Sequence, residues 1–429
     1  MRYCIKGGEI IDPAGNFTET GDLLLEDGKV LAVGRELPQE NAQVIQAAGK
    51  IVCPGLIDLH SHLREPGRED EETIASGAKA ALKGGFTAVL SMANTNPAAD
   101  SPVVIEYVKR RAKESGYAKV YPAGAITKGL QGIELAEMGE MAAAGAIAFS
   151  DDGKTLMNPA VLRSALEYSK LFNLPLLLHE EENHLSGDGV MHEGYWSTVL
   201  GLPGIPTLAE TTMIARDLLL AEETGAKVHF CHLSAMESVS LIEQAKKRGL
   251  SITAEAAPHH LALTDAALEG YDPVFRVSPP LRAGKDREAL QRGLQSGVID
   301  VVATDHAPHT LEEKHREFSL APPGMIGFET ALSVIWTVLV APGVLTKTQL
   351  VERMAIRPAQ ILNVPGGRLR PGDPADVVVI DPNFEWEVKE TDLISKSKNC
   401  PFIGWKLRGK VASVWVDGCL KYHQNEFQD

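Results

Sequence analysis

Two histidines spaced two residues apart, His60 and His62, end an apolar run in the segment VCPGLIDLHSHLREPG, residues 52–67. Side chains two residues apart on a strand point to the same side, so Arg64 would face the same way as both imidazoles. Neutral imidazole is a common metal ligand, and a guanidinium can hold a carboxylate through two charge-assisted hydrogen bonds. The spacing therefore predicts a metal beside a handle for an anionic substrate.

Other apolar runs of the chain also end in histidine or aspartate. Eight of the 13 histidines lie at or just beyond such ends. Histidine and aspartate without cysteine favour zinc, manganese or iron in a hydrolytic site over a structural zinc. We expect the metal ligands to be His60, His62, Asp152, His179, His232 and Asp305. His259 and His260 are interpreted either as contacts behind the ligands, as substrate contacts or as structural residues, and His229, His184, His192, His315 and His423 as structural.

These residues need elements that bring distant segments together. Eight apolar strand-like runs alternate with helical patterns at residues 50–60, 86–93, 118–127, 145–152, 174–181, 226–235, 250–261 and 300–309. Strands that are apolar on both faces and alternate with helices indicate a parallel sheet covered by helices. Eight such units favour a (β/α)8 TIM barrel, in which functional residues lie at the carboxyl ends of the strands. Both ends of the chain instead favour small antiparallel sheets.

Composition narrows the class of protein. The 429 residues are 44% hydrophobic and 23% charged, as in an ordinary soluble globular protein, and no apolar run is long enough to span a membrane. A formal net charge of −15 argues against a nucleic-acid partner. Five scattered cysteines without a CxxC pair suggest reduced thiols and a cytoplasmic location.

Several segments together resemble the bacterial dihydroorotases of the amidohydrolase superfamily. The most specific are HLREPG and TDHAPH, and the resemblance extends over nearly the whole chain. The other matching segments are NTNP (94–97), FSDDGK (149–154), HEE (179–181), GVMHEGYWSTVLGLPGIPTLAE (189–210), CHLS (231–234), SPPLR (278–282) and MIGFET (325–330). The resemblance implies a hydrolase barrel of residues 54–365 and a composite β-sandwich domain of residues 1–53 and 366–429.

The resemblance also implies roles for the candidate residues. One metal would be held by His60, His62 and Asp305, and a second by His179 and His232. Asp152 is the expected bridge, with Asp151 and Lys154 as alternatives. The ions would be one or two Zn²⁺ per subunit, or another divalent metal. Arg64, Asn94 and His309 would hold a substrate carboxylate, unless Arg64 is paired with Glu65 or another acid, and Ser278 is a further expected substrate contact.

The implied reaction is the reversible hydrolysis of the cyclic amide of dihydroorotate to N-carbamoyl-L-aspartate in pyrimidine biosynthesis. A metal lowers the pKa of water and polarises a carbonyl, and Asp305 would move the proton to the leaving nitrogen. Ser278 replaces an asparagine common in dihydroorotases, which leaves dihydropyrimidinase, hydantoinase and allantoinase open. A non-catalytic dihydroorotase-like subunit of aspartate transcarbamoylase is a further alternative. The family suggests a homodimer, and association with aspartate transcarbamoylase stays open. The polar segment 309–324 is expected to be either a lid or an ordinary mobile loop.

Overall fold

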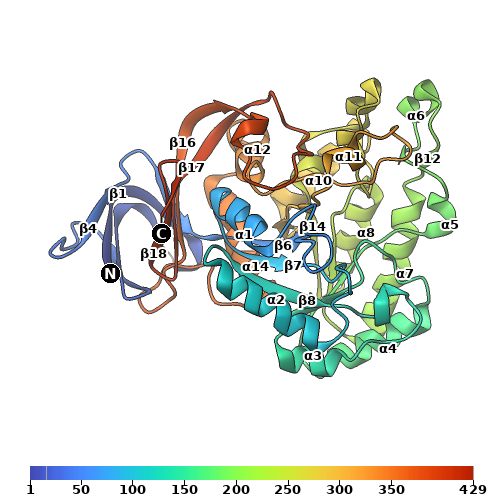
Figure 1. Cartoon of the computed structure of the whole chain (residues 1–429), viewed down its shortest axis with the longest axis horizontal. Helices are drawn as coiled ribbons and strands as arrows, with labels where there is room; N and C mark the ends of the chain where they lie inside the picture. Colours follow the sequence, from blue (N-terminus) through green and yellow to red (C-terminus); the bar gives the residue numbers. More distant parts are fainter. Residues whose placement is uncertain (16, 429) are drawn as a thin grey trace.

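Eight parallel strands form the centre of the computed structural model. The structure describes residues 1–15 and 17–428 (Figure 1). Each strand pairs with the next one along the chain, and a bridge between Ser61 and His306 joins the first strand to the segment after the last. This nearly closed barrel confirms the predicted fold. Its strands are β6 (Leu56–Ser61), β7 (Phe86–Ser91), β8 (Lys119–Gly124), β9 (Ala148–Ser150), β10 (Leu176–Leu178), β13 (Val228–Phe230), β14 (Ile252–Ala256) and β15 (Val301–Val302).

Helices cover the barrel, and α4 illustrates why they form where they do. The side chain of Asn158 accepts a hydrogen bond from the backbone of Ala160, and Pro159 occupies the first turn. The helix then buries Leu162, Ala165, Leu166 and Ser169, which lie on one face. The helices around the strands are α1 (Ile74–Lys83), α2 (Pro102–Ser115), α3 (Met138–Ala144), α4 (Pro159–Ser169), α7 (Leu208–Thr224), α8 (Met236–Lys247), α10 (Gly284–Ser296), α12 (Ala331–Ile335), α13 (Lys347–Val351) and α14 (Arg357–Leu362), with π-helical turns η5 (Trp336–Val340) and η6 (Glu352–Ile356).

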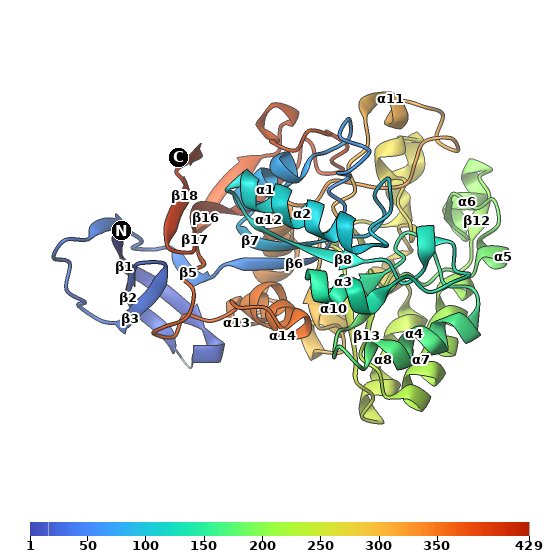
Figure 2. The same cartoon turned by 60° about the horizontal axis from the view of Figure 1, so that its bottom comes forward.

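The two ends of the chain meet in one nine-stranded sheet beside the barrel (Figures 1 and 2). The antiparallel pairing of β5 with β16 joins the N-terminal strands to the C-terminal ones, with Cys53 opposite Val378. The strands are β1 (Arg2–Asp12), β2 (Phe17–Glu26), β3 (Lys29–Gly34), β4 (Gln43–Gln46), β5 (Ile51–Pro54), β16 (Val377–Glu387), β17 (Lys406–Val416), β18 (Cys419–His423) and β19 (Glu426–Phe427).

The apolar run that leads to His60 is two strands rather than one. Residues 51–54 form β5 in the terminal sheet, and residues 56–61 form β6 in the barrel. Gly55 lies between them, where a Cβ atom would come within 2.2 Å of Thr87 Oγ1. Because both strands are fully buried, hydrophobicity alone does not show this division.

Short elements after the strands form the rim of the barrel and an excursion at the end far from the terminal sheet (Figure 1). They are η2 (Lys128–Leu130), α5 (Asn183–Ser186), β11 (Met191–His192), α6 (Tyr195–Leu200), β12 (Gly204–Ile205), α9 (Pro258–Ala262), η3 (Asp265–Gly270), η4 (Pro273–Phe275) and α11 (Leu311–Lys314). Two more short elements, η1 (Pro13–Gly15) and η7 (Glu390–Asp392), follow β1 and β16 of the terminal sheet. Within the described residues, every helix is too short or too polar to cross a membrane.

Candidate active site

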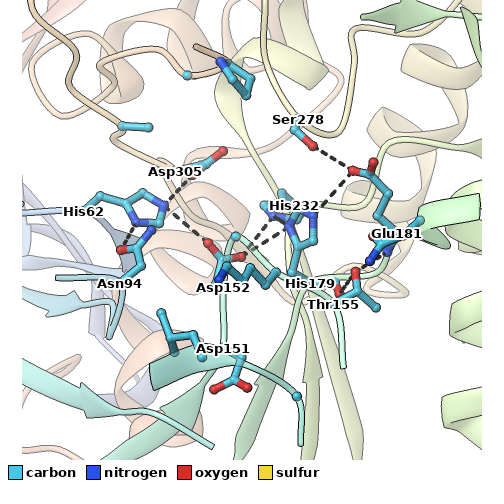
Figure 3. A pocket seen from close by; sticks show the side chains of 18 of the residues that line it. His62, Asn94, Asp151, Asp152, Thr155, His179, Glu181, His232, Ser278 and Asp305 are labelled. Carbon is cyan, nitrogen blue, oxygen red and sulfur yellow. Dashed lines mark hydrogen bonds and ion pairs between the residues drawn. The ribbon is translucent and has the colours of Figure 1, made fainter. Parts of the chain in front are cut away.

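The six predicted metal ligands converge at the carboxyl ends of the barrel strands. Figure 3 shows His62, Asp152, His179, His232 and Asp305 of this set. They arrive from β6, β9, β10, β13 and β15, and all six side chains are buried. They form two groups of three, in each of which the candidate ligand atoms lie within 4.8 Å of one another. The groups are His60, His62 and Asp305, and Asp152, His179 and His232.

Asp152 lies between the two groups. Its Oδ2 is 3.2 Å from Nε2 of His60 and 3.4 Å from Nε2 of His62. Its Oδ1 is 3.4 Å from Nδ1 of His179 and 3.3 Å from Nε2 of His232. One carboxylate thus presents a separate oxygen to each group, which is the arrangement that a bridging ligand requires.

The donor set of this centre fits divalent metal. Nε2 of His60 and Oδ1 of Asp152 are buried and have no hydrogen-bond partner among the described residues. Burial alone would lower the pKa of His60, yet Asp152 and Glu255 raise it well above its usual value. Burial would raise the pKa of Asp152, but His60 and the other histidines hold it well below its usual range. The centre therefore favours positive charge, which a metal ion bound by imidazole and carboxylate would supply.

Asp151 and Lys154, the alternative bridges, are placed differently. Oδ1 of Asp151 accepts hydrogen bonds from the backbone of Ile126 at 2.8 Å and of Thr127 at 3.0 Å. Its Oδ2 accepts from the Thr127 hydroxyl, and Figure 3 shows the carboxylate directed away from Asp152. Lys154 lines the pocket. Of the two aspartates, the geometry therefore favours Asp152 as the bridge.

A cavity of about 780 Å³ opens over this centre. Its volume is in the range of small-molecule sites. All four predicted substrate contacts line it together with five of the candidate metal ligands. The nine residues are Arg64, Asn94, Ser278 and His309, and His62, Asp152, His179, His232 and Asp305.

Arg64 reaches this cavity from a strained backbone position, with φ at +61°. Its Nε lies 3.0 Å from Oε2 of Glu71 and donates to the carbonyl of Pro308 at 3.1 Å. Glu71 also contacts His309, whose Nδ1 lies 2.9 Å from Oε1. Arg64 thus forms the ion pair that the sequence left as an alternative, and its partner is Glu71. Glu65, the acid named there, contacts Arg111 at 2.6 Å instead. Glu71 uses only the inner Nε of Arg64 and fixes the guanidinium at the cavity wall.

Asn94 and Ser278 both line the cavity and are both linked to the candidate metal centre. Oδ1 of Asn94 lies 2.8 Å from Nδ1 of His62. The Ser278 hydroxyl donates to Oε2 of Glu181 at 2.9 Å, and Glu181 lies 3.6 Å from Nε2 of His179 (Figure 3). Both predicted substrate contacts are therefore connected to a candidate ligand, directly or through one acid.

The structure adds Glu255 on β14, which the sequence interpretation did not single out. Its Oε1 lies 2.6 Å from Nδ1 of His60, and its Oε2 lies 3.0 Å from Nε2 of His229. His60 and His229 hold the pKa of this carboxyl at about 2, against the effect of its burial. The sequence feature that could have identified Glu255 is an acidic residue inside the apolar run ITAEA, where an unpaired charge would be costly.

Three further polar residues near the centre belong to neither of the two groups of candidate metal ligands. His259 and His260 are on α9, and burial lowers the pKa of both. Nε2 of His260 lies 2.9 Å from the carbonyl of Pro279. Cys231 lies within 4.8 Å of the facing atoms of His60 and Asp152, and burial raises the pKa of its thiol well above the usual value. It is therefore a buried thiol beside the centre.

The segment 309–324 forms part of the cavity wall, to which His309, Pro323 and Gly324 contribute. Lys314, which belongs to this segment, is buried and donates to the carbonyls of Pro322 at 3.0 Å and Gly324 at 3.2 Å. Burial lowers the pKa of this lysine to about 7. The buried hydrogen bonds anchor the segment in this position.

Comparisons with known proteins show the family to which the chain belongs. The family model described as "Dihydro-orotase-like" matches residues 49–238. A dihydroorotase of Pelotomaculum thermopropionicum is 51% identical over 97% of this chain and 98% of its own length. One of Syntrophus aciditrophicus is 47% identical over 99% of this chain and 100% of its own length.

Solved structures show the same architecture. The L-hydantoinase (dihydropyrimidinase) of Arthrobacter aurescens superposes with a TM-score of 0.89 at 25% identity, over 100% of this chain and 97% of its own. A dihydropyrimidinase of Brevibacillus agri, at 22% identity and a TM-score of 0.85, shares the fold. On the strength of the full-length sequence relatives, this chain belongs to the dihydroorotase family.

Proposed function

We propose that this protein is a metal-dependent dihydroorotase that opens and closes the ring of dihydroorotate. The observation that carries the proposal is the cavity in which Arg64 lies beside the six-residue centre. A small ring with one carboxylate can place that carboxylate at Arg64 while its amide lies over the histidines. Full-length relatives named dihydroorotase support the same reaction.

The candidate ligands fit one or two divalent ions, and we propose zinc. His60, His62 and Asp305 would hold one ion, His179 and His232 the other, and Asp152 would bridge them. Bound metal would lower the pKa of water and polarise the amide carbonyl. The chain's own groups then do the rest: Arg64, Asn94 and His309 orient the substrate, and Asp305 accepts a proton from the attacking water and delivers it to the leaving ring nitrogen.

A second candidate function is hydantoinase or dihydropyrimidinase activity. Ser278 favours it, as does the 25% identical L-hydantoinase structure. Those substrates have no carboxylate for Arg64 to hold. Convergence of all six candidate ligands supports a catalytic chain over a silent scaffold subunit.

The test is a substrate panel on zinc-loaded protein. Dihydroorotate should be hydrolysed, with dihydrouracil, hydantoin and allantoin poor substrates. Arg64→Ala should lower kcat/KM for dihydroorotate about 100-fold, because charge-assisted hydrogen bonds contribute about 1.5–3 kcal/mol each. Residual activity on dihydrouracil should not change. Failure to turn over dihydroorotate or carbamoyl-aspartate would refute the proposal.

Arg292→Ala is the control for Arg64→Ala. Arg292 is an exposed arginine of α10 that pairs with Glu288 at 3.6 Å. We expect nearly unchanged kcat/KM, because exposed ion pairs contribute about 0–1 kcal/mol.

Assembly and location are further parts of the proposal. We propose a cytoplasmic homodimer and leave association with aspartate transcarbamoylase to a binding assay with that enzyme. Light scattering of the purified protein tests the dimer.

We also propose residues 54–365 as the hydrolase domain and residues 1–53 with 366–429 as a composite β-domain. The pairing of β5 with β16 supports this division.

A further inference from the structure

Glu255 contacts three residues at the inner side of the candidate metal centre. Its carboxylate is buried, with 1% of the residue exposed. Oε1 lies 2.6 Å from Nδ1 of His60 and accepts from the backbone N–H of His232 at 3.1 Å. Oε2 lies 3.0 Å from Nε2 of His229. Both oxygens are thus occupied, and two of the contacts are to candidate metal ligands.

The contact with His60 determines which ring nitrogen carries the proton. Nε2 of His60 faces Asp152 at 3.2 Å and Asp305 at 3.5 Å, on the side where the metal would lie. A ligand nitrogen needs a free lone pair, so the proton of the neutral ring must be on Nδ1. Glu255 is an acceptor at that position and stabilises this tautomer and this ring orientation.

His229 completes the arrangement from the other side of the carboxylate. Its Nδ1 lies 2.8 Å from Oγ1 of Thr253, two residues before Glu255 on the same strand. Its Nε2 can then donate to Oε2 of Glu255. The carboxylate is held from both ends, so it cannot rotate away from His60 without losing the contact to His229.

We propose that Glu255 is a positioning residue that sets metal affinity by holding His60 in its ligating tautomer and by placing a negative charge behind it. This inference rests on the proposed function, because it assumes a metal at the six-residue centre. A carboxylate bound to the far nitrogen of a ligating histidine raises the basicity of the ligand, and loss of such a partner typically costs about 10–100-fold in metal affinity.

The alternative is that Glu255 only stabilises the fold, as a buried acid between two histidines. Activity alone does not separate the two roles, because a destabilised barrel also loses activity. Metal affinity of the folded protein does separate them. A residue that acts only on stability leaves the dissociation constant of the metal unchanged at a temperature where the protein is folded.

The experiment titrates metal-free protein with Zn²⁺, and with Co²⁺ to follow its visible absorption spectrum. Glu255→Gln keeps the size of the side chain and removes the charge. We expect about 10–100-fold weaker binding and a changed Co²⁺ spectrum. The matched control is Asp300→Asn, another buried acid of the barrel, which pairs with Arg357 at 2.7 Å and accepts from the backbone of Ala254 at 2.9 Å. It should bind metal as the wild type does.

A second pair of variants covers the case in which Glu255→Gln does not fold. His229→Gln can still donate to Oε2 of Glu255 and should keep wild-type affinity. His229→Leu removes that donor, frees the carboxylate and should bind metal more weakly. Equal affinity in both His229 variants would overturn the inference.

The outcomes separate this inference from the proposed function. Wild-type protein that binds neither ion overturns the proposed function, and this inference with it. Wild-type protein that binds metal, with the same affinity and spectrum in Glu255→Gln, overturns this inference alone. Weaker binding in Glu255→Gln with unchanged binding in Asp300→Asn supports it.

Discussion

Asn94 connects the candidate metal centre to the substrate pocket, and its replacement tests that connection. Nε2 of His62 faces Asp305 at 3.2 Å, so a ligating His62 carries its proton on Nδ1. Oδ1 of Asn94, 2.8 Å away, accepts a hydrogen bond from that N–H group. The amide nitrogen is then left as a donor, and Asn94 lines the cavity in which we place the substrate carboxylate.

The variant Asn94→Asp removes only the second of these contacts. An aspartate oxygen can still accept from His62 and adds a negative charge behind that ring, so we expect metal affinity at least equal to that of the wild type. The donor to the substrate is lost, and a like charge takes its place. A charge-assisted hydrogen bond contributes about 1.5–3 kcal/mol. Since 1.4 kcal/mol corresponds to a factor of ten, we expect KM for dihydroorotate to rise by about 100-fold.

Steady-state kinetics and metal titration of two variants provide the measurement. Asn94→Ala loses both contacts and should show weaker metal binding as well as a higher KM. Residual turnover of dihydrouracil, which has no carboxylate, should be unchanged in Asn94→Asp. If Asn94→Asp keeps the wild-type KM, or loses metal as strongly as Asn94→Ala, the reasoning is refuted.

Three further predictions concern the bridge, the buried lysine and the metal. Asp152→Asn should lose bound metal by elemental analysis, whereas Asp151→Asn should keep its metal and melt at a lower Tm; equal metal loss in both would contradict the assignment of the bridge. Burial lowers the pKa of Lys314 to about 7 from an ordinary value of about 10.4, so the unfolded chain binds more protons than the folded chain between these values. The Tm of the wild type relative to Lys314→Met should therefore rise from pH 7 to pH 9, and a constant difference would contradict this. Removal of metal by a chelator should lower Tm and abolish activity, and added Zn²⁺ should restore both.

The barrel could be predicted from the sequence because its pattern is local. Runs that are apolar on both faces, such as residues 86–91, need cover on both sides, and helices between them supply it. The positions of the candidate ligands follow from the same pattern, because carboxyl ends of parallel strands meet at one rim. His62 and Asp305, far apart in the chain, could therefore be assigned to one centre.

The choice among neighbouring groups required the three-dimensional structure. Asp151 and Asp152 are adjacent and chemically identical, yet one accepts backbone hydrogen bonds and the other faces four histidines. Hydrophobicity also predicted one strand over residues 50–60, where the structure has two strands in different sheets. Side-chain direction and sheet membership depend on neighbours that are distant in sequence.

The sequence by itself determined the donor types, their order along the chain and the barrel that gathers them. Only the tertiary structure decided the partners of each donor: Glu255 behind His60, Asn94 behind His62, and Glu71 beside Arg64. The physical reason is that a buried charge or imidazole proton must find a partner, and the nearest one is set by packing across the barrel. That packing joins residues as far apart as His60 and Glu255, which no local pattern connects.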